Sequence, residues 1–174
     1  MTGDLSTRNI VLTGFMGTGK STVGPMLAER LGFRFVDTDE VIERRHGPIP
    51  EIFATYGEAG FREAEAVLAM ELADDDGLVI STGGGMLMHP TNVRVLSSSG
   101  DIYCLTASVG TIVQRLRGDG AVTRPLLAGD DPAERVRSLL EERRERYAAF
   151  EQIDTDRWTP AEVVERIVEL RATS

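Results

Sequence analysis

Short runs of apolar residues alternate along the chain with longer stretches in which apolar positions recur at helical spacing. The short runs are bounded by glycine or polar residues and predict β-strands at residues 9–13, 33–36, 78–81, 102–105 and 152–153. The longer stretches predict helices at residues 20–31, 39–46, 49–56, 60–73, 90–97, 109–116, 132–150 and 159–170. This alternation indicates an α/β fold, in which helices cover both faces of a parallel sheet.

One long segment, residues 117–131, lacks either pattern and contains three glycines. A loop of this length inside a compact domain usually has a function. No internal repeat or linker divides the chain, and 174 residues are a normal length for one domain. We therefore expect residues 1–174 to form a single domain that carries one functional loop.

Composition narrows the range of functions. The formal net charge of −9 would repel nucleic acids and anionic lipids over most of the surface. No apolar run is long enough to span a membrane, and the N-terminus does not read as a signal peptide, so we expect a cytoplasmic protein without nucleic-acid or membrane partners. The only cysteine, Cys104, is expected to be a buried strand residue without chemistry.

The only lysine of the chain, Lys20, belongs to the most specific motif. Residues 14–21 read Gly-Phe-Met-Gly-Thr-Gly-Lys-Ser, which fits the G-x-x-x-x-G-K-S pattern and directly follows a predicted strand. In such a loop main-chain N–H groups surround phosphate oxygens, the lysine reaches the β- and γ-phosphates, and the serine binds Mg²⁺. A glycine-rich turn before a solvated lysine is the alternative. The predicted nucleotide-binding residues here are Gly17, Thr18, Gly19, Lys20, Ser21 and Thr22.

Three further motifs follow predicted strands or open predicted helices. Asp37 and Asp39 come directly after the second strand, where one carboxylate can hold a metal through water and the other can orient an acceptor hydroxyl. Capping of the next helix is the alternative for these carboxylates. Arg62 and Glu65 have the spacing of a helical ion pair, which is either a surface pair or part of a site. Three glycines at residues 83–85 favour close approach of the main chain to a ligand over a plain turn.

Taken together, these motifs resemble the shikimate kinases, a family with the nucleoside-monophosphate-kinase-like P-loop fold. The resemblance covers nearly the whole chain and rests on Arg143, Tyr147 and the segments 14–21, 37–39, 57–65, 83–85 and 124–127. It implies a five-stranded parallel sheet flanked by helices in three layers, with a mobile lid at about 117–131 and shikimate-binding helices at about 38–74. Arg144 and Arg146 lie beside Arg143, so the choice among them rests on alignment and on the helix face shared with Tyr147.

The resemblance also implies an activity, namely ATP-dependent phosphorylation of the shikimate 3-hydroxyl to 3-phosphoshikimate in aromatic amino-acid biosynthesis. A monomer that requires Mg²⁺ is expected, with Ser21 as a metal ligand and Asp37 acting through water. The catalytic residues would be Lys20, Asp39 and Arg124. Shikimate would be bound by Asp39, Phe53, Phe61, Arg62, Gly83, Gly84, Gly85 and Arg143, and the nucleotide would also meet Arg117, Arg124 and Pro160. A gluconate-type kinase and a non-catalytic nucleotide-binding regulator are the alternatives.

Overall fold

The computed structural model describes residues 7–118 and 131–173. Its five strands form one parallel sheet in the order β2-β3-β1-β4-β5. The strands are β1 (Asn9–Thr13), β2 (Arg34–Asp37), β3 (Leu78–Ser81), β4 (Gly100–Thr106) and β5 (Glu151–Asp154). All five residues of the central strand β1 are buried, as expected when helices cover both faces of a parallel sheet. The predicted α/β fold class is confirmed.

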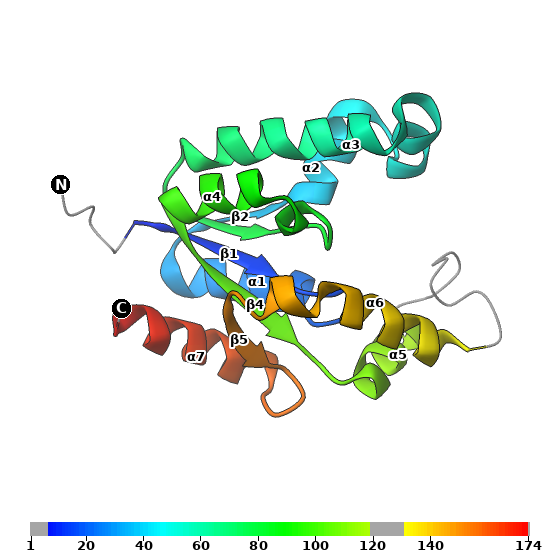
Figure 1. Cartoon of the computed structure of the whole chain (residues 1–174). Coiled ribbons are helices and arrows are strands. Elements are labelled where there is room, and N and C mark those ends of the chain that lie inside the picture. Colours follow the sequence, from blue (N-terminus) through cyan, green and yellow to red (C-terminus); the bar gives the residue numbers. More distant parts are fainter. Residues whose placement is uncertain (1–6, 119–130, 174) are drawn as a thin grey trace.

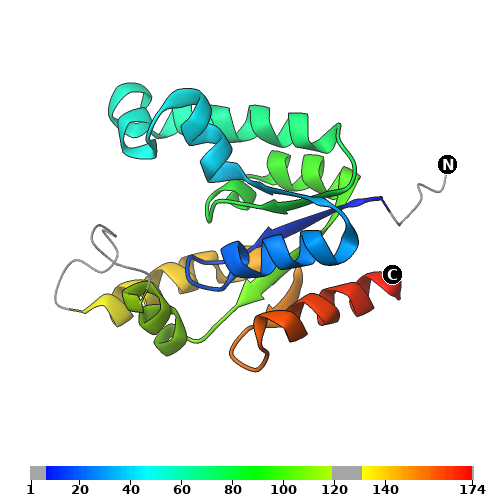
Figure 2. The same ribbon diagram turned by 180° about the vertical axis from the view of Figure 1, so that it is seen from behind.

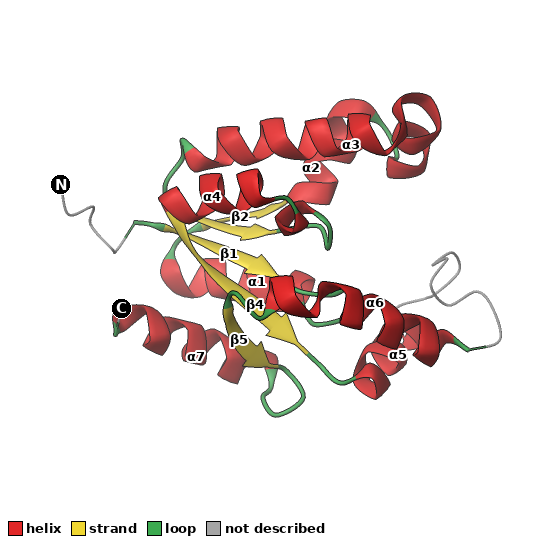
Figure 3. Ribbon diagram, in the orientation of Figure 1, coloured by secondary structure: helices red, strands yellow, loops and turns green. Residues whose placement is uncertain are grey.

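Helices cover the two faces of the sheet unequally (Figures 1 and 3). Helices α1 (Lys20–Leu31) and α7 (Pro160–Ala172) lie side by side on one face, as Figure 2 shows. The other face is covered by α2 (Thr38–His46), α3 (Ile49–Ala73) and α4 (Pro90–Ser99). Helices α5 (Val109–Gly118) and α6 (Pro132–Tyr147) pack together beyond the end of β4, and a short 3-10 turn, η1 (Met86–Met88), follows β3.

The predicted elements are all present, with small differences at their ends. The two helices expected at 49–56 and 60–73 are both present within α3 and meet at a kink at Gly57, where the main-chain φ is 68°. Glycine tolerates this left-handed conformation because it has no Cβ. Helix α6 ends at Tyr147 rather than at residue 150, and Thr159 caps α7 through a capping box with Glu162 instead of lying inside it.

The strand ends bring the predicted site residues to one edge of the sheet. The phosphate-binding loop follows β1, Asp37 ends β2, and the three glycines come shortly after β3. Because parallel strands all end on the same side, these segments meet at the carboxyl edge. No helix within the described residues is both long and apolar enough to cross a membrane.

Candidate active site

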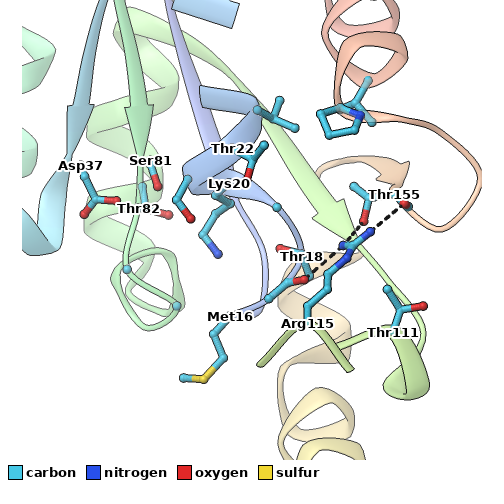
Figure 4. A pocket seen from close by; sticks show the side chains of 18 of the residues that line it. Met16, Thr18, Lys20, Thr22, Asp37, Ser81, Thr82, Thr111, Arg115 and Thr155 are labelled. Carbon is cyan, nitrogen blue, oxygen red and sulfur yellow. Dashed lines mark hydrogen bonds between the residues drawn. The ribbon is translucent and has the colours of Figure 1, made fainter. Parts of the chain in front are cut away.

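A cavity of about 920 Å³ opens at the carboxyl edge of the sheet. Its centre is the loop after β1, and its two sides are built by different strands. Figure 4 shows Asp37 and Thr82 on one side of Lys20, and Arg115 with Thr155 on the other. The residues that line it are Met16, Gly17, Thr18, Gly19, Lys20, Ser21, Thr22, Val23, Asp37, Asp39, Ser81, Thr82, Gly83, Gly84, Thr111, Gln114, Arg115, Gly118, Arg143, Thr155, Trp158, Pro160 and Val163.

The loop at residues 14–21 has the main-chain conformation that its glycines allow. Gly14, Gly17 and Gly19 all have positive φ, at 131°, 77° and 104°. A side chain at Gly14 would collide with the carbonyl of Leu105 in β4, so the loop can lie against the sheet only with glycine there. Gly19 caps α1, and the positive end of that helix therefore faces the cavity.

Lys20 is held inside the loop by main-chain oxygens. Its Nζ atom donates hydrogen bonds to the carbonyls of Gly14, at 2.7 Å, and Phe15, at 3.0 Å. Burial lowers the pKa of the Lys20 amine to about 8, although the nearby carboxylates of Asp39 and Asp37 favour the charged form. The amine is therefore mainly protonated at neutral pH, as a phosphate ligand should be.

Asp37 and Asp39 line the same side of the cavity but differ in their partners. Asp37 Oδ1 accepts hydrogen bonds from the main-chain N–H groups of Asp39, at 3.0 Å, and Glu40, at 3.2 Å, so Asp37 caps α2. The two expectations for this residue are thus compatible, since it both caps the helix and faces the cavity. Within the described residues the Asp39 carboxylate accepts none of the assigned hydrogen bonds. Burial, reinforced by Asp37 and Glu65, raises the pKa of Asp39 to about 6.

Each glycine at residues 83–85 leaves room for one side chain of the predicted acceptor site. A Cβ on the first glycine would collide with the carboxylate of Asp39. On the second it would lie 2.9 Å from Arg143 Nη1, and on the third 2.5 Å from Arg62 Nη1. The sequence analysis expected a ligand to approach the main chain at these glycines. The structure shows that side chains of the protein also occupy the space that a glycine, which has no side chain, leaves open.

Arg62 takes part in more than a surface ion pair. Its Nη1 atom lies 2.7 Å from Glu65, whose side chain is only 1% exposed, and its Nη2 atom lies 3.2 Å from Glu58. Burial raises the pKa of Glu65, and the neighbouring Arg62 opposes that rise. The Arg62 guanidinium also lies over the ring of Phe61, which in turn packs against Phe53. Of the predicted acceptor residues, Arg62, Phe53, Phe61 and Gly85 lie outside the set that lines the cavity.

Helix α6 presents one of its three neighbouring arginines to the cavity. Arg143 lines the cavity and donates to the carbonyl of Gly84 at 3.3 Å, and the Tyr147 hydroxyl donates to the same carbonyl at 3.4 Å. Arg144 is exposed and pairs with Glu141, and Arg146 is also exposed. Of these three arginines, Arg143 is the one that lines the cavity.

The opposite side of the cavity contains an arginine that the sequence analysis missed. Arg115 Nη1 donates to the carbonyl of Gly17 at 3.1 Å and to Thr155 Oγ1 at 2.9 Å (Figure 4). The predicted nucleotide contact Arg117 is exposed and is not among the lining residues, whereas Pro160 is. Two residues along a helix correspond to about 200°, so Arg115 and Arg117 necessarily point in different directions.

Helical spacing offered a signal for Arg115, because Thr111 and Arg115 share one face of α5 at i, i+4 and both line the cavity. The remaining predicted residue, Arg124, lies outside the described residues, as do positions 119–130 of the predicted lid.

A strand, a glycine-rich phosphate loop and a helix at the edge of a five-stranded parallel sheet define this chain as a P-loop kinase of the nucleoside-monophosphate-kinase-like fold. The family model described as shikimate kinase matches residues 16–171. A shikimate kinase from Thermodesulfovibrio yellowstonii is 44% identical over 163 residues, which cover 92% of this chain and 93% of that protein. The chain belongs to the shikimate kinase family.

Solved structures agree with this assignment. The structure of a shikimate kinase from Acinetobacter baumannii in complex with shikimate has a TM-score of 0.85 and 38% identity, and the match covers 95% of this chain and 93% of that one. A gluconokinase from Sinorhizobium meliloti is also similar, with a TM-score of 0.66, 20% identity and coverage of 95% and 92%. At that identity the second likeness shows a shared fold alone.

Proposed function

We propose that this protein transfers the γ-phosphoryl group of ATP to the 3-hydroxyl of shikimate, which gives 3-phosphoshikimate and ADP. The observation that carries the proposal is the convergence of Lys20, Asp39 and Arg143 on one cavity, which contains a phosphate-binding loop. A half-buried cation for phosphate, a carboxylate for a hydroxyl and a guanidinium for a carboxylate match the groups of these two substrates.

On the acceptor side, Arg143 would bind the shikimate carboxylate, assisted by Arg62. Both guanidinium groups approach the three-glycine segment, which limits how far apart they can lie. Asp39, which has no hydrogen bond to its carboxylate within the described residues, is free to accept one from the reacting hydroxyl. Phe53 and Phe61 would wall the ring from the side of α3, where their ring centroids are 4.9 Å apart.

On the donor side, Lys20 would exchange the carbonyls of Gly14 and Phe15 for oxygens of the β- and γ-phosphates. The loop N–H groups and the start of α1 would bind the same phosphates, at Gly17, Thr18, Gly19, Ser21 and Thr22. Pro160, Trp158 and Arg115 line the far part of the cavity, so we place the adenine there and assign to Arg115 the contact that the sequence suggested for Arg117. Arg124 keeps its predicted role at the transferred phosphoryl group.

The residues at the centre of the cavity fit Mg²⁺, which prefers oxygen ligands and keeps several waters and phosphates in its shell. Ser21 offers a hydroxyl, and both assigned hydrogen bonds to the Asp37 carboxylate go to Oδ1, so within the described residues Oδ2 accepts none of them. No group of three or more His, Cys, Asp or Glu side chains gathers into a metal site in residues 7–118 and 131–173, so the ion would arrive with ATP. When bound, Mg²⁺ neutralises charge on the phosphates and helps to orient them.

The proposal includes a single kinase domain, with shikimate-binding helices within residues 38–74 and a lid at 117–131, that acts as a monomer. Because the reaction needs ATP, we place it in the cytoplasm. Light scattering after size-exclusion chromatography tests the monomer, since a mass near twice 19.0 kDa would contradict it.

A coupled assay of ADP release tests the function directly. Purified protein with MgATP should release ADP with shikimate, and much more slowly with gluconate or without an acceptor. Equal or faster turnover of gluconate would favour the gluconate-type alternative. ATP binding without ADP release under any condition would favour the regulator. Lys20→Ala is the matched control, since contaminating kinases would remain active in its preparation.

A further inference from the structure

Phe15, in the phosphate-binding loop, touches the predicted acceptor site although its ring does not line the cavity. The ring is 1% exposed and belongs to a buried cluster that includes Cys104, Ile112 and Tyr147. The guanidinium carbon of Arg143 lies over the ring, 5.5 Å from its centroid. This distance is within the range in which an aromatic face attracts a cation.

The main chain of Phe15 is fixed as firmly as its ring. Its carbonyl accepts hydrogen bonds from Thr18 Oγ1 at 2.7 Å, from the Thr18 N–H at 3.3 Å and from Lys20 Nζ at 3.0 Å. Burial leaves the ring little freedom to rotate away. The ring therefore forms a rigid support for whatever lies on it.

The two arginines of the acceptor site are held in different ways. Arg62 is paired with two carboxylates, Glu65 and Glu58. No carboxylate in the described residues lies within salt-bridge distance of Arg143. Its uncharged partners are the carbonyl of Gly84, to which it donates at 3.3 Å, and the side chain of Tyr147. An aromatic face holds a guanidinium without neutralising it and without using its N–H groups, which stay available for a bidentate bond to a carboxylate.

We infer that Phe15 is a positioning residue for the acceptor, because its ring orients Arg143 toward the shikimate carboxylate and leaves free the charge of that arginine and the N–H groups that Gly84 and Tyr147 do not use. This inference rests on the proposed function. It gives a residue of the phosphate-binding loop a second role, at the other substrate.

The test reduces the negative electrostatic potential on the face of the Phe15 ring and nearly keeps the shape of the ring. Site-specific replacement of Phe15 by 3,4,5-trifluorophenylalanine should raise the KM for shikimate about three- to ten-fold, the range that loss of one partly buried cation–π contact gives. The kcat and the KM for ATP should stay within about two-fold. Phe15→Leu, which removes the aromatic face but stays apolar, should raise the KM for shikimate at least as much.

The chain offers a matched control at Phe33. Its ring lies 5.1 Å below the guanidinium carbon of Arg171 in an equivalent contact, and neither residue lines the cavity. The same fluorinated residue at Phe33 should leave all kinetic constants unchanged.

An unchanged KM for shikimate in the fluorinated Phe15 protein, or an equal rise in the Phe33 control, would overturn the inference. A rise in the KM for ATP alone would also overturn it, because the ring would then support only the phosphate loop. If the wild-type protein does not phosphorylate shikimate, the proposed function fails instead. The fluorinated protein keeps the test valid even if Phe15→Leu does not fold.

Discussion

Replacing Asp39 with Asn should make the protein more stable and abolish its activity. The Asp39 carboxylate is largely buried, lies near Asp37 and Glu65, and accepts no assigned hydrogen bond within the described residues. Its pKa is therefore raised from 3.8 to about 6 in the folded protein. A group whose folded pKa is raised binds its proton more tightly in the folded state, so its ionisation opposes folding.

The size of the effect follows from that shift. A rise of roughly two pKa units corresponds to about 3 kcal/mol of unfolding free energy lost at pH 7.5, when the carboxylate is ionised. Relaxation of the neighbouring side chains reduces this figure, so we expect Asp39→Asn to stabilise the protein by about 1–3 kcal/mol. For a chain of this size, that is an increase in Tm of about 3–10 °C.

The direction of the Asp39 pKa shift determines how the gain in stability of Asp39→Asn depends on pH. Well above pH 6 the carboxylate is charged in both states and the full difference in stability between variant and wild type is present. As the pH falls below 6 the folded wild type takes up a proton, and below about 3.8 the unfolded chain does so too. The stability difference should therefore be nearly constant from pH 7.5 to about pH 6.5 and shrink as the pH falls from about 6 to 4.

Thermal unfolding of both proteins between pH 4 and pH 7.5, with ADP-release assays at pH 7.5, measures both effects. Asp37→Asn is the matched control. The Asp37 carboxylate accepts two main-chain hydrogen bonds, so its replacement by a neutral amide should give no gain in stability. An Asp39→Asn gain that is the same at pH 4 and pH 7.5 would refute the reasoning, since such a gain cannot arise from a titrating carboxylate. A lower Tm at pH 7.5 would refute it as well.

Four further outcomes test individual assignments. Arg143→Ala should raise the KM for shikimate by about ten-fold or more, while the exposed Arg144→Ala changes it by less than about two-fold; the opposite ranking would move the carboxylate site. An amine-directed acylating reagent at pH 8, near the pKa of Lys20, should abolish activity, and MgATP should slow that loss far more than shikimate does. Full activity after modification of Lys20, checked by peptide mass, would contradict the phosphate-loop assignment. ADP should change the fluorescence of Trp158, the only tryptophan, much more than shikimate does, and the reverse would place the adenine elsewhere. Arg124→Ala should lower kcat by about 10³-fold with smaller effects on either KM, and unchanged turnover would exclude it from catalysis.

Features that depend on local sequence were predictable. The bounds of β1 and α1 match the prediction, because an apolar run, a glycine loop and a helical pattern follow one another without a gap. The break in α3 at Gly57 lies in the interval between the two predicted helices. The kink requires a left-handed main-chain conformation that glycine tolerates, so the local sequence already indicated this break.

Features that depend on contacts between distant segments were less predictable. The glycines at 83–85 showed that something approaches the main chain, but not that side chains from α2, α3 and α6 do so. Arg115 was missed because its role depends on Gly17 and Thr155, which lie 98 and 40 residues away. Such contacts follow from the order of the strands in the sheet, which the sequence does not state.

The strand order also explains why the cavity has two chemically different sides. Because β1 lies between β3 and β4, the phosphate-binding loop lies at the centre of the carboxyl edge. On one side, β3 and β2 end near the three glycines and Asp39, where the acceptor would bind. On the other, β4 and β5 lead to Arg115, Thr155 and Pro160, where the base would bind. The γ-phosphate would then lie at Lys20, between donor and acceptor, so the order of the five strands would align the two substrates for transfer in one line.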